Sequence, residues 1–140
     1  MKRILVLIIA MAALATACSS SVFSLAAGDC FNDPDAEQVS SVETVECTET
    51  HDNEVYSLVD LSSQTTDDYP GEFEVQELAS ESCLDQFEGY VGLDYESSKF
   101  GVSFLTPSDE SWDDGDREVV CFLFDFTGAT LNASAQNSGL

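Results

Sequence analysis

The sequence predicts an α+β fold, a mostly antiparallel β-sheet with one main helix packed on a face and two disulfides. Segments with the two-residue alternation of strands lie on both sides of one segment with helical three- and four-residue spacing. The chain has 140 residues, which is enough for a single domain. Its cysteines beyond residue 18 are even in number, as in the disulfide framework of an exported protein.

The N-terminal segment is typical of a secretory signal. Its first three residues include a lysine and an arginine, and the apolar run that follows, residues 4–17, has 14 residues. A lasting membrane span needs roughly 20 apolar residues. Residues 1–17 are therefore predicted to be a signal peptide.

Cys18 follows small residues in a pattern that resembles a bacterial lipobox. In that pattern the cysteine thiol is diacylated, so Cys18 is expected to carry palmitate-type chains that anchor the protein in a membrane. Residues 18–21 are then a short tether, and residues 22–140 are the folded domain. The alternative is ordinary cleavage after Ala17, without a lipid.

Four further cysteines are predicted to form two disulfides in an oxidising compartment. We favour Cys30–Cys47 with Cys83–Cys121, because each pair would join elements expected to be neighbours, although the sequence alone allows three pairings. A zinc site is the alternative. No two cysteines have the close spacing of zinc knuckles and only His51 could assist them, so no metal is expected.

Extended segments are expected in the first half of the mature chain at residues 22–25, 30–31, 39–47 and 54–61. The segment 30–31 resumes the first, so 54–61 is the third strand candidate. Gly28 and Asp29 indicate a turn or bulge before the second of them. Residues 32–35, which include Asn, Asp and Pro, indicate a turn after it. A polar loop is expected over residues 62–71.

The helix begins at Glu72 and ends at Gly92 in this prediction. Its apolar stripe comprises Val75, Leu78, Ala79, Cys83, Phe87, Tyr90 and Val91. The opposite face is acidic, so like charges three and four residues apart repel one another. The helix must therefore be held by its buried face.

Two strands are expected after the helix, at 100–105 and 119–126, with a short last strand at 129–131. The acidic segment 109–116 is interpreted as a solvated turn. Arg117 is one of two cations left in the mature chain, and its guanidinium is expected to bind a carboxylate and fix the loop after Trp112 to the sheet.

The charge of the chain excludes a nucleic-acid partner. The formal net charge is −23, and removal of Lys2 and Arg3 with the signal would make it −25. Nucleic-acid binding depends on lysine and arginine neutralising phosphates. The acidity has two interpretations, adaptation to a saline environment or attraction of a basic partner.

No residue pattern predicts catalysis. His51 is the only histidine, and it is expected to pack at the start of a strand and to hydrogen-bond the backbone or Glu54. No nucleophile-elbow motif is present, and an EF-hand frame would place Trp112 where calcium needs a carboxylate. The protein is therefore expected to be no enzyme and to need no cofactor.

Three motifs together resemble the septum formation domain of actinobacterial envelope proteins. The residues that carry the resemblance are Gly28, Asp29 and Cys30, then Cys47, His51, Glu54 and Val55, and finally Trp112, Gly115, Asp116 and Arg117. The resemblance extends from about residue 22 to the end. It implies a membrane-tethered extracytoplasmic domain linked to cell division, and it implies no catalytic residue. The tail, residues 131–140, lacks the basic residues expected there.

The function expected from these observations is that of a lipid-anchored interaction module on the outer face of the cytoplasmic membrane, with an envelope protein as partner. The motif residues are expected to serve structure or partner binding. Two alternatives remain, a small-ligand or cation-binding accessory domain, and an envelope enzyme or enzyme inhibitor. A cleft lined by His51 would favour chemistry, and an apolar patch near Trp112 or Tyr95 would favour a protein partner.

Overall fold

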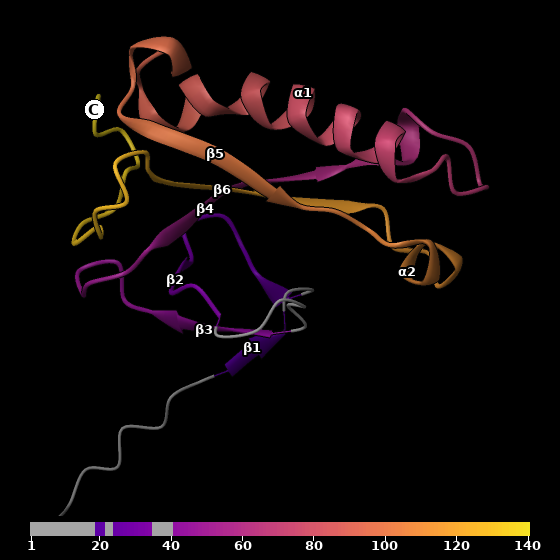
Figure 1. Cartoon of the computed structure of the whole chain (residues 1–140), viewed down its shortest axis with the longest axis horizontal. Helices are drawn as coiled ribbons and strands as arrows, with labels where there is room; N and C mark the ends of the chain where they lie inside the picture. Colours follow the sequence, from indigo (N-terminus) through magenta and orange to yellow (C-terminus); the bar gives the residue numbers. More distant parts are fainter. Residues whose placement is uncertain (1–18, 22–23, 35–40) are drawn as a thin grey trace, which may run out of the picture.

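The computed structural model describes residues 19–21, 24–34 and 41–140 (Figure 1). The predicted signal peptide and Cys18 lie outside these residues, as do residues 22–23 of the first predicted strand. The remainder of that strand, Ser24 and Leu25, is not in extended sheet structure. Among the described helices, none combines the length and the apolar character needed to cross a membrane.

Six strands pair in the order β1-β3-β2-β4-β6-β5, and every pairing is antiparallel. Their bounds are β1 Ser19–Ser21, β2 Cys30–Phe31, β3 Ser41–Val45, β4 Asn53–Asp60, β5 Phe100–Leu105 and β6 Glu118–Asp125. The serines expected to form the tether thus make up β1, which pairs with β3. The predicted antiparallel sheet is confirmed.

Helix α1, Glu72–Val91, lies across one face of the sheet beside β4 and β5 (Figure 1). Gly92 ends it in the left-handed conformation, with φ of 82°, which glycine adopts without strain. The buried positions fall on the predicted stripe; they are Val75, Ala79, Cys83, Phe87 and Val91. The single main helix is therefore confirmed at its predicted bounds.

Both favoured disulfides are present. Cys30–Cys47 joins β2 to the turn after β3, and Cys83–Cys121 joins α1 to the central strand β6. Cys83 and Cys121 have no exposed surface, so this second bridge runs through the core between the helix and the sheet.

Two hydrophobic clusters lie on opposite faces of the sheet. The larger joins α1 to inward residues of β4, β5 and β6, and the smaller packs residues of β2, β3 and β6 together. Tyr56 stands at the irregularity where the β4–β6 register shifts, and its hydroxyl donates to the Cys83 carbonyl at 2.8 Å. Burial raises the pKa of Tyr56 above its ordinary value.

Two short elements in the second half of the chain also differ from prediction. The segment expected to be a solvated turn contains helix α2, Asp109–Asp113, because Ser108 and Ser111 form a capping box that satisfies its first turn. The expected last strand is a single bridge between Leu131 and His51. Short 3-10 helices also occur at Leu61–Ser63 and Tyr95–Ser97.

Candidate functional site

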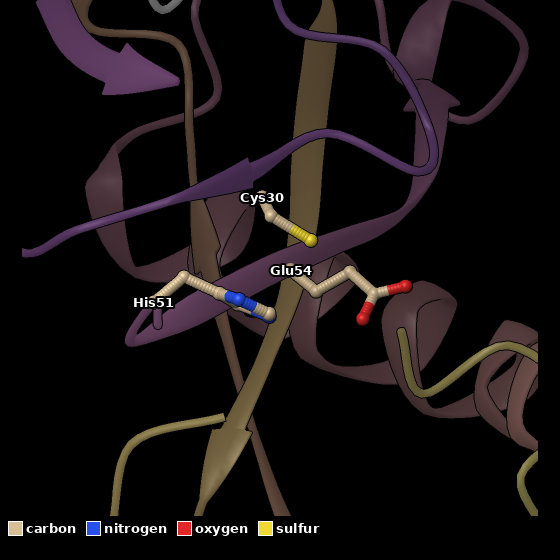
Figure 2. A group of neighbouring side chains, drawn as sticks. All are labelled: Cys30, His51 and Glu54. Atoms are coloured by element: carbon tan, nitrogen blue, oxygen red, sulfur yellow. The ribbon is translucent and has the colours of Figure 1, made fainter. Parts of the chain in front are cut away.

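His51, Glu54 and Cys30 form a buried cluster between β2 and β4 (Figure 2). Their ligand atoms, one from each residue, lie within 4.8 Å of one another. The Nδ1 of His51 donates to the Glu49 carbonyl at 2.8 Å, since a carbonyl can only accept. The Nε2 has no hydrogen-bond partner among the residues that the structure describes. The predicted backbone bond of His51 is confirmed.

Glu54 is fully buried, and its carboxylate accepts three hydrogen bonds. Its Oε1 accepts from the Tyr90 hydroxyl at 2.6 Å and from the Ser134 hydroxyl at 2.6 Å. Its Oε2 accepts from the Ala135 amide at 2.7 Å. Glu54 therefore links β4 to α1 and to the C-terminal tail, and burial followed by this contact raises the pKa of Tyr90.

The tail is held along the domain by further contacts. The amide of Asn137 donates to the Tyr90 carbonyl at 2.8 Å, and that of Gly139 donates to the Val91 carbonyl at 2.9 Å. Ala135 is buried. The C-terminal segment thus completes the core around Glu54.

The cluster has the residue types of a metal site, but two of its three candidate ligands, Cys30 and Glu54, are already engaged. The sulfur of Cys30 is bonded to Cys47, so it is no thiolate ligand. Both oxygens of Glu54 accept hydrogen bonds from the chain. With the disulfide formed, the Nε2 of His51 is the one ligand atom of the three that has no partner among the described residues.

Gly28 and Asp29 build the turn that brings Cys30 to its disulfide. Gly28 has φ of 97°, and its amide donates to the Val55 carbonyl at 2.7 Å. The Val55 amide donates in return to the Asp29 carbonyl at 2.8 Å, and the Asp29 carboxylate accepts from the Ala26 amide at 2.8 Å. These contacts connect the first motif to the strand that carries Glu54.

Trp112 and Arg117 form a second structural cluster. The Trp112 indole is buried, and its Nε1 donates to the Asp67 carbonyl at 3.0 Å. The guanidinium of Arg117 lies 3.8 Å from the centre of the indole ring and donates to the carbonyls of Trp112, Asp116 and Asp67. Gly115, with φ of 93°, makes the turn between them.

The predicted carboxylate partner of Arg117 is wrong. The ion pair found among the described residues joins Lys99 to Asp125 at 3.6 Å, and Arg117 binds carbonyls instead. The turn directs the Trp112 and Asp116 carbonyls at the guanidinium, and the loop before α1 adds the Asp67 carbonyl. The Asp116 carboxylate accepts instead from the Glu118 amide. Partial burial, and then repulsion from Asp116 and Asp60, raises the pKa of Glu118.

A hollow of about 350 Å³ lies on the sheet face opposite α1. Phe122 and Phe124 line it together with three carboxylates, those of Asp33, Asp52 and Asp125. Each carboxylate is held by donors of the chain itself. Hydrogen bonds from the side chain and backbone of Thr127 lower the pKa of Asp125.

A second hollow of about 630 Å³ runs along α1 beside β5. The residues that line it are Phe73, Gln76, Glu77, Ser80, Glu81, Leu84 and Phe104. His51 and Trp112 line neither hollow, and both side chains are buried. Tyr95 is partly exposed.

Four partners in these clusters could not be inferred from the sequence. Tyr90 was placed on the buried stripe, but nothing in the spacing indicated its bond to Glu54. Ser134 and Ala135 lie 80 and 81 residues from Glu54, which no local pattern could connect. Asp67 accepts through its backbone carbonyl, so its side-chain identity gives no sign of this role in the sequence.

The fold and the two clusters define a class, a disulfide-bonded α+β domain whose motif side chains bind the chain itself. A family model described as septum formation matches residues 13–137, so the chain belongs to the septum formation family. This membership indicates association with the cell envelope or the division septum. Searches of the curated proteins and of the solved structures each found no match.

Proposed function

We propose that the protein is a lipid-anchored domain on the outer face of the cytoplasmic membrane, and that it acts at the envelope or septum by binding another protein without catalysis. The observation that carries this proposal is the engagement of the motif side chains. Glu54 accepts three hydrogen bonds inside the core, and Arg117 binds three carbonyls over Trp112. The motifs hold the fold, and function is left to the surface.

Two further observations support the setting. Both disulfides suit an oxidising compartment, since cytosolic thiols are kept reduced. Membership of the family described as septum formation supports a role at the division septum. Cys18, preceded by an apolar run and small residues, supplies the anchor in this proposal.

Complementation of a strain that lacks the protein tests the proposal. The deletion is expected to misplace or delay septa under the microscope, and the wild-type chain to restore them. His51→Asn is expected to restore them as well, provided that immunoblots show equal amounts, because the proposal gives His51 no chemical role. Cys18→Ser is expected to restore them poorly and to leave the membrane fraction.

Two results would overturn the proposal. Normal septa and an intact envelope in the deletion strain would show that the protein does not act in septum formation or at the envelope. A His51→Asn chain that is present at wild-type amounts, with a wild-type melting temperature, yet fails to complement would indicate chemistry at the buried cluster.

A further inference from the structure

We propose that the hollow between α1 and β5 binds an extended basic segment of a partner protein, which pairs with the free edge of β5 as an added strand. This inference rests on the proposed function, because it names the surface and the partner chemistry of the interaction domain. It depends on three observations: a free strand edge, an exposed apolar stripe and a local excess of negative charge.

The first observation is the edge. β5 is the last strand of the sheet, and among the described strands only β6 pairs with it. The Phe126 amide donates to the Lys99 carbonyl, so the hydrogen-bonded pairs that follow in this register are those of Gly101, Ser103 and Leu105. The backbone groups of Val102 and Phe104 therefore point away from β6.

The sequence of β5 lacks the features that usually protect an edge strand from pairing. Natural edge strands carry charged residues, prolines or bulges that block a further strand. The sequence of β5 is FGVSFL, which contains no charge and no proline, and its register with β6 is regular over all six residues. An uncharged edge of this length is suited to strand addition.

The second observation is an apolar stripe next to that edge. Phe73 is 82% exposed and Leu84 is 39% exposed, and both lie on the side of α1 that borders the hollow. Phe104 of β5, partly buried, closes the hollow from the sheet side. Helix α1 contacts β5, and Figure 1 shows the strand beside part of the helix. A large apolar side chain on the added strand would lie between them.

The third observation is the charge. Glu77 and Glu81 line the hollow, and no cation does. The cations of the described chain lie elsewhere, Lys99 beside Asp125 and Arg117 over Trp112. The chain as a whole carries −23, so an acidic segment would be repelled and a lysine- or arginine-bearing segment attracted.

The probe is a fluorescent nine-residue peptide with a Val-Thr-Phe-Thr-Val centre and two lysines at each end. Alternate side chains place its apolar groups on one face and leave its ends near the glutamates. Binding to the protein purified from membranes in detergent is measured by fluorescence anisotropy. Two control peptides carry glutamates in place of the lysines, or N-methyl groups on the amides that would pair with β5.

The variants separate this surface from the rest of the molecule. Phe73→Ser is expected to weaken binding of the lysine peptide by about tenfold, as loss of a central aromatic anchor does. The matched control is Phe126→Ser, since Phe126 is 75% exposed but does not line the hollow. It is expected to leave binding unchanged. Both control peptides are expected to bind at least tenfold more weakly, one by repulsion and one by loss of backbone pairing.

Several outcomes would overturn the inference. Equal binding of the lysine and glutamate peptides would show that the surface does not select a basic segment. Equal binding of the N-methyl peptide would show that the peptide does not pair with β5 as an added strand. An unchanged affinity in Phe73→Ser places the probe elsewhere. Sedimentation that shows a wild-type dimer abolished by Phe73→Ser would instead make a second copy of the chain the occupant.

The inference and the proposed function can fail separately. If Phe73→Ser restores septa in the deletion strain as fully as Phe126→Ser does, the interaction role survives and its assignment to this surface is wrong. If neither deletion nor complementation affects the septum, while the peptide results hold, the surface survives and the proposed process is wrong.

Discussion

The Tyr90 hydroxyl of α1 donates to the buried carboxylate of Glu54 on β4 at 2.6 Å. Because the same carboxylate accepts from Ser134 and Ala135, one side chain connects the sheet, the helix and the tail. Removing such an acceptor leaves several buried donors without a hydrogen-bond partner at once. An unsatisfied buried group costs about 1–3 kcal/mol.

Glu54→Gln is therefore expected to lower the free energy of unfolding by about 2–4 kcal/mol, because an amide offers only one oxygen and places an NH₂ group against a donor. Denaturant unfolding measures the loss, and hydrogen exchange at the Ala135 amide should accelerate more than exchange in β6. The control is Glu88→Gln on the exposed side of α1, expected to change stability by less than about 0.5 kcal/mol. Equal stabilities of the two variants would contradict the role of Glu54.

Arg117→Met is expected to lower the melting temperature clearly, because it removes three donated hydrogen bonds and the stack on Trp112. Hydrogen bonds from a charged donor contribute about 1.5–3 kcal/mol. Arg117→Lys should recover little of the loss, since an ammonium lacks the planar fork. The control is Lys99→Met, whose half-exposed ion pair contributes about 1 kcal/mol or less. An unchanged melting temperature in Arg117→Met would show that Arg117 does not fix the loop after Trp112 to the rest of the domain.

Acid should remove the contribution of Asp125. Its pKa is lowered in the fold, mainly by hydrogen bonds from Thr127, so the unfolded chain takes up a proton more readily than the folded chain. The stability difference between wild type and Asp125→Asn is expected to be present at neutral pH. It should shrink as pH falls below the ordinary value of 3.8 and vanish below the folded pKa. Parallel unfolding curves from pH 7 to pH 2 measure it, and a constant difference would show that ionisation of Asp125 contributes nothing.

Salt is expected to stabilise the protein. The chain has 27 acidic and 4 basic residues, and self-repulsion falls as the screening length drops from about 10 Å at 0.1 M to about 3 Å at 1 M salt. The melting temperature should rise by about 5 °C or more over this range. A neutral osmolyte at equal osmolality is the control for effects other than screening. A flat response to salt, or an equal response to the osmolyte, would count against repulsion as a major term.

Removal of Cys83–Cys121 should be more harmful than removal of Cys30–Cys47. The two bridges close loops with sequence separations of 38 and 17, and loop entropy assigns the longer one the greater effect, about 3–4 kcal/mol for each bridge. Cys83 and Cys121 are also fully buried, so alanine in their place would leave a cavity in the core. Double Cys→Ala variants compared by denaturant unfolding test the order. The opposite order would mean that the β2 turn limits stability.

The sequence was sufficient for elements whose signal is local. The stripe from Val75 to Val91 and the glycine at 92 indicated α1, and the apolar run of β6 indicated a central strand. It was insufficient where a short motif gains its meaning from distant groups. The pairing of Glu54 with Ser134 depends on how the tail returns to the sheet, and Arg117 found carbonyls because backbone oxygens leave no pattern in a sequence.

The acidic segment at 109–116 shows a related limit. Its carboxylates suggested a solvated turn, but Ser108 and Ser111 cap a helical turn that buries Trp112. The capping serines were visible in the sequence, and a five-residue helix is too short for apolar periodicity to reveal. The surface proposed for a partner was equally hidden, since Phe73 and Phe104 become neighbours only when α1 packs on β5.

The central claim, a lipid-anchored and disulfide-bonded domain outside the cytoplasm, is tested most directly by mass spectrometry. The protein is purified from membranes of its native host, and its intact and proteolysed masses are measured with and without reduction. The expected species is a chain that begins at a diacylated Cys18 and carries the bridges Cys30–Cys47 and Cys83–Cys121. An unlipidated N-terminus, or free thiols at those four cysteines, would contradict it.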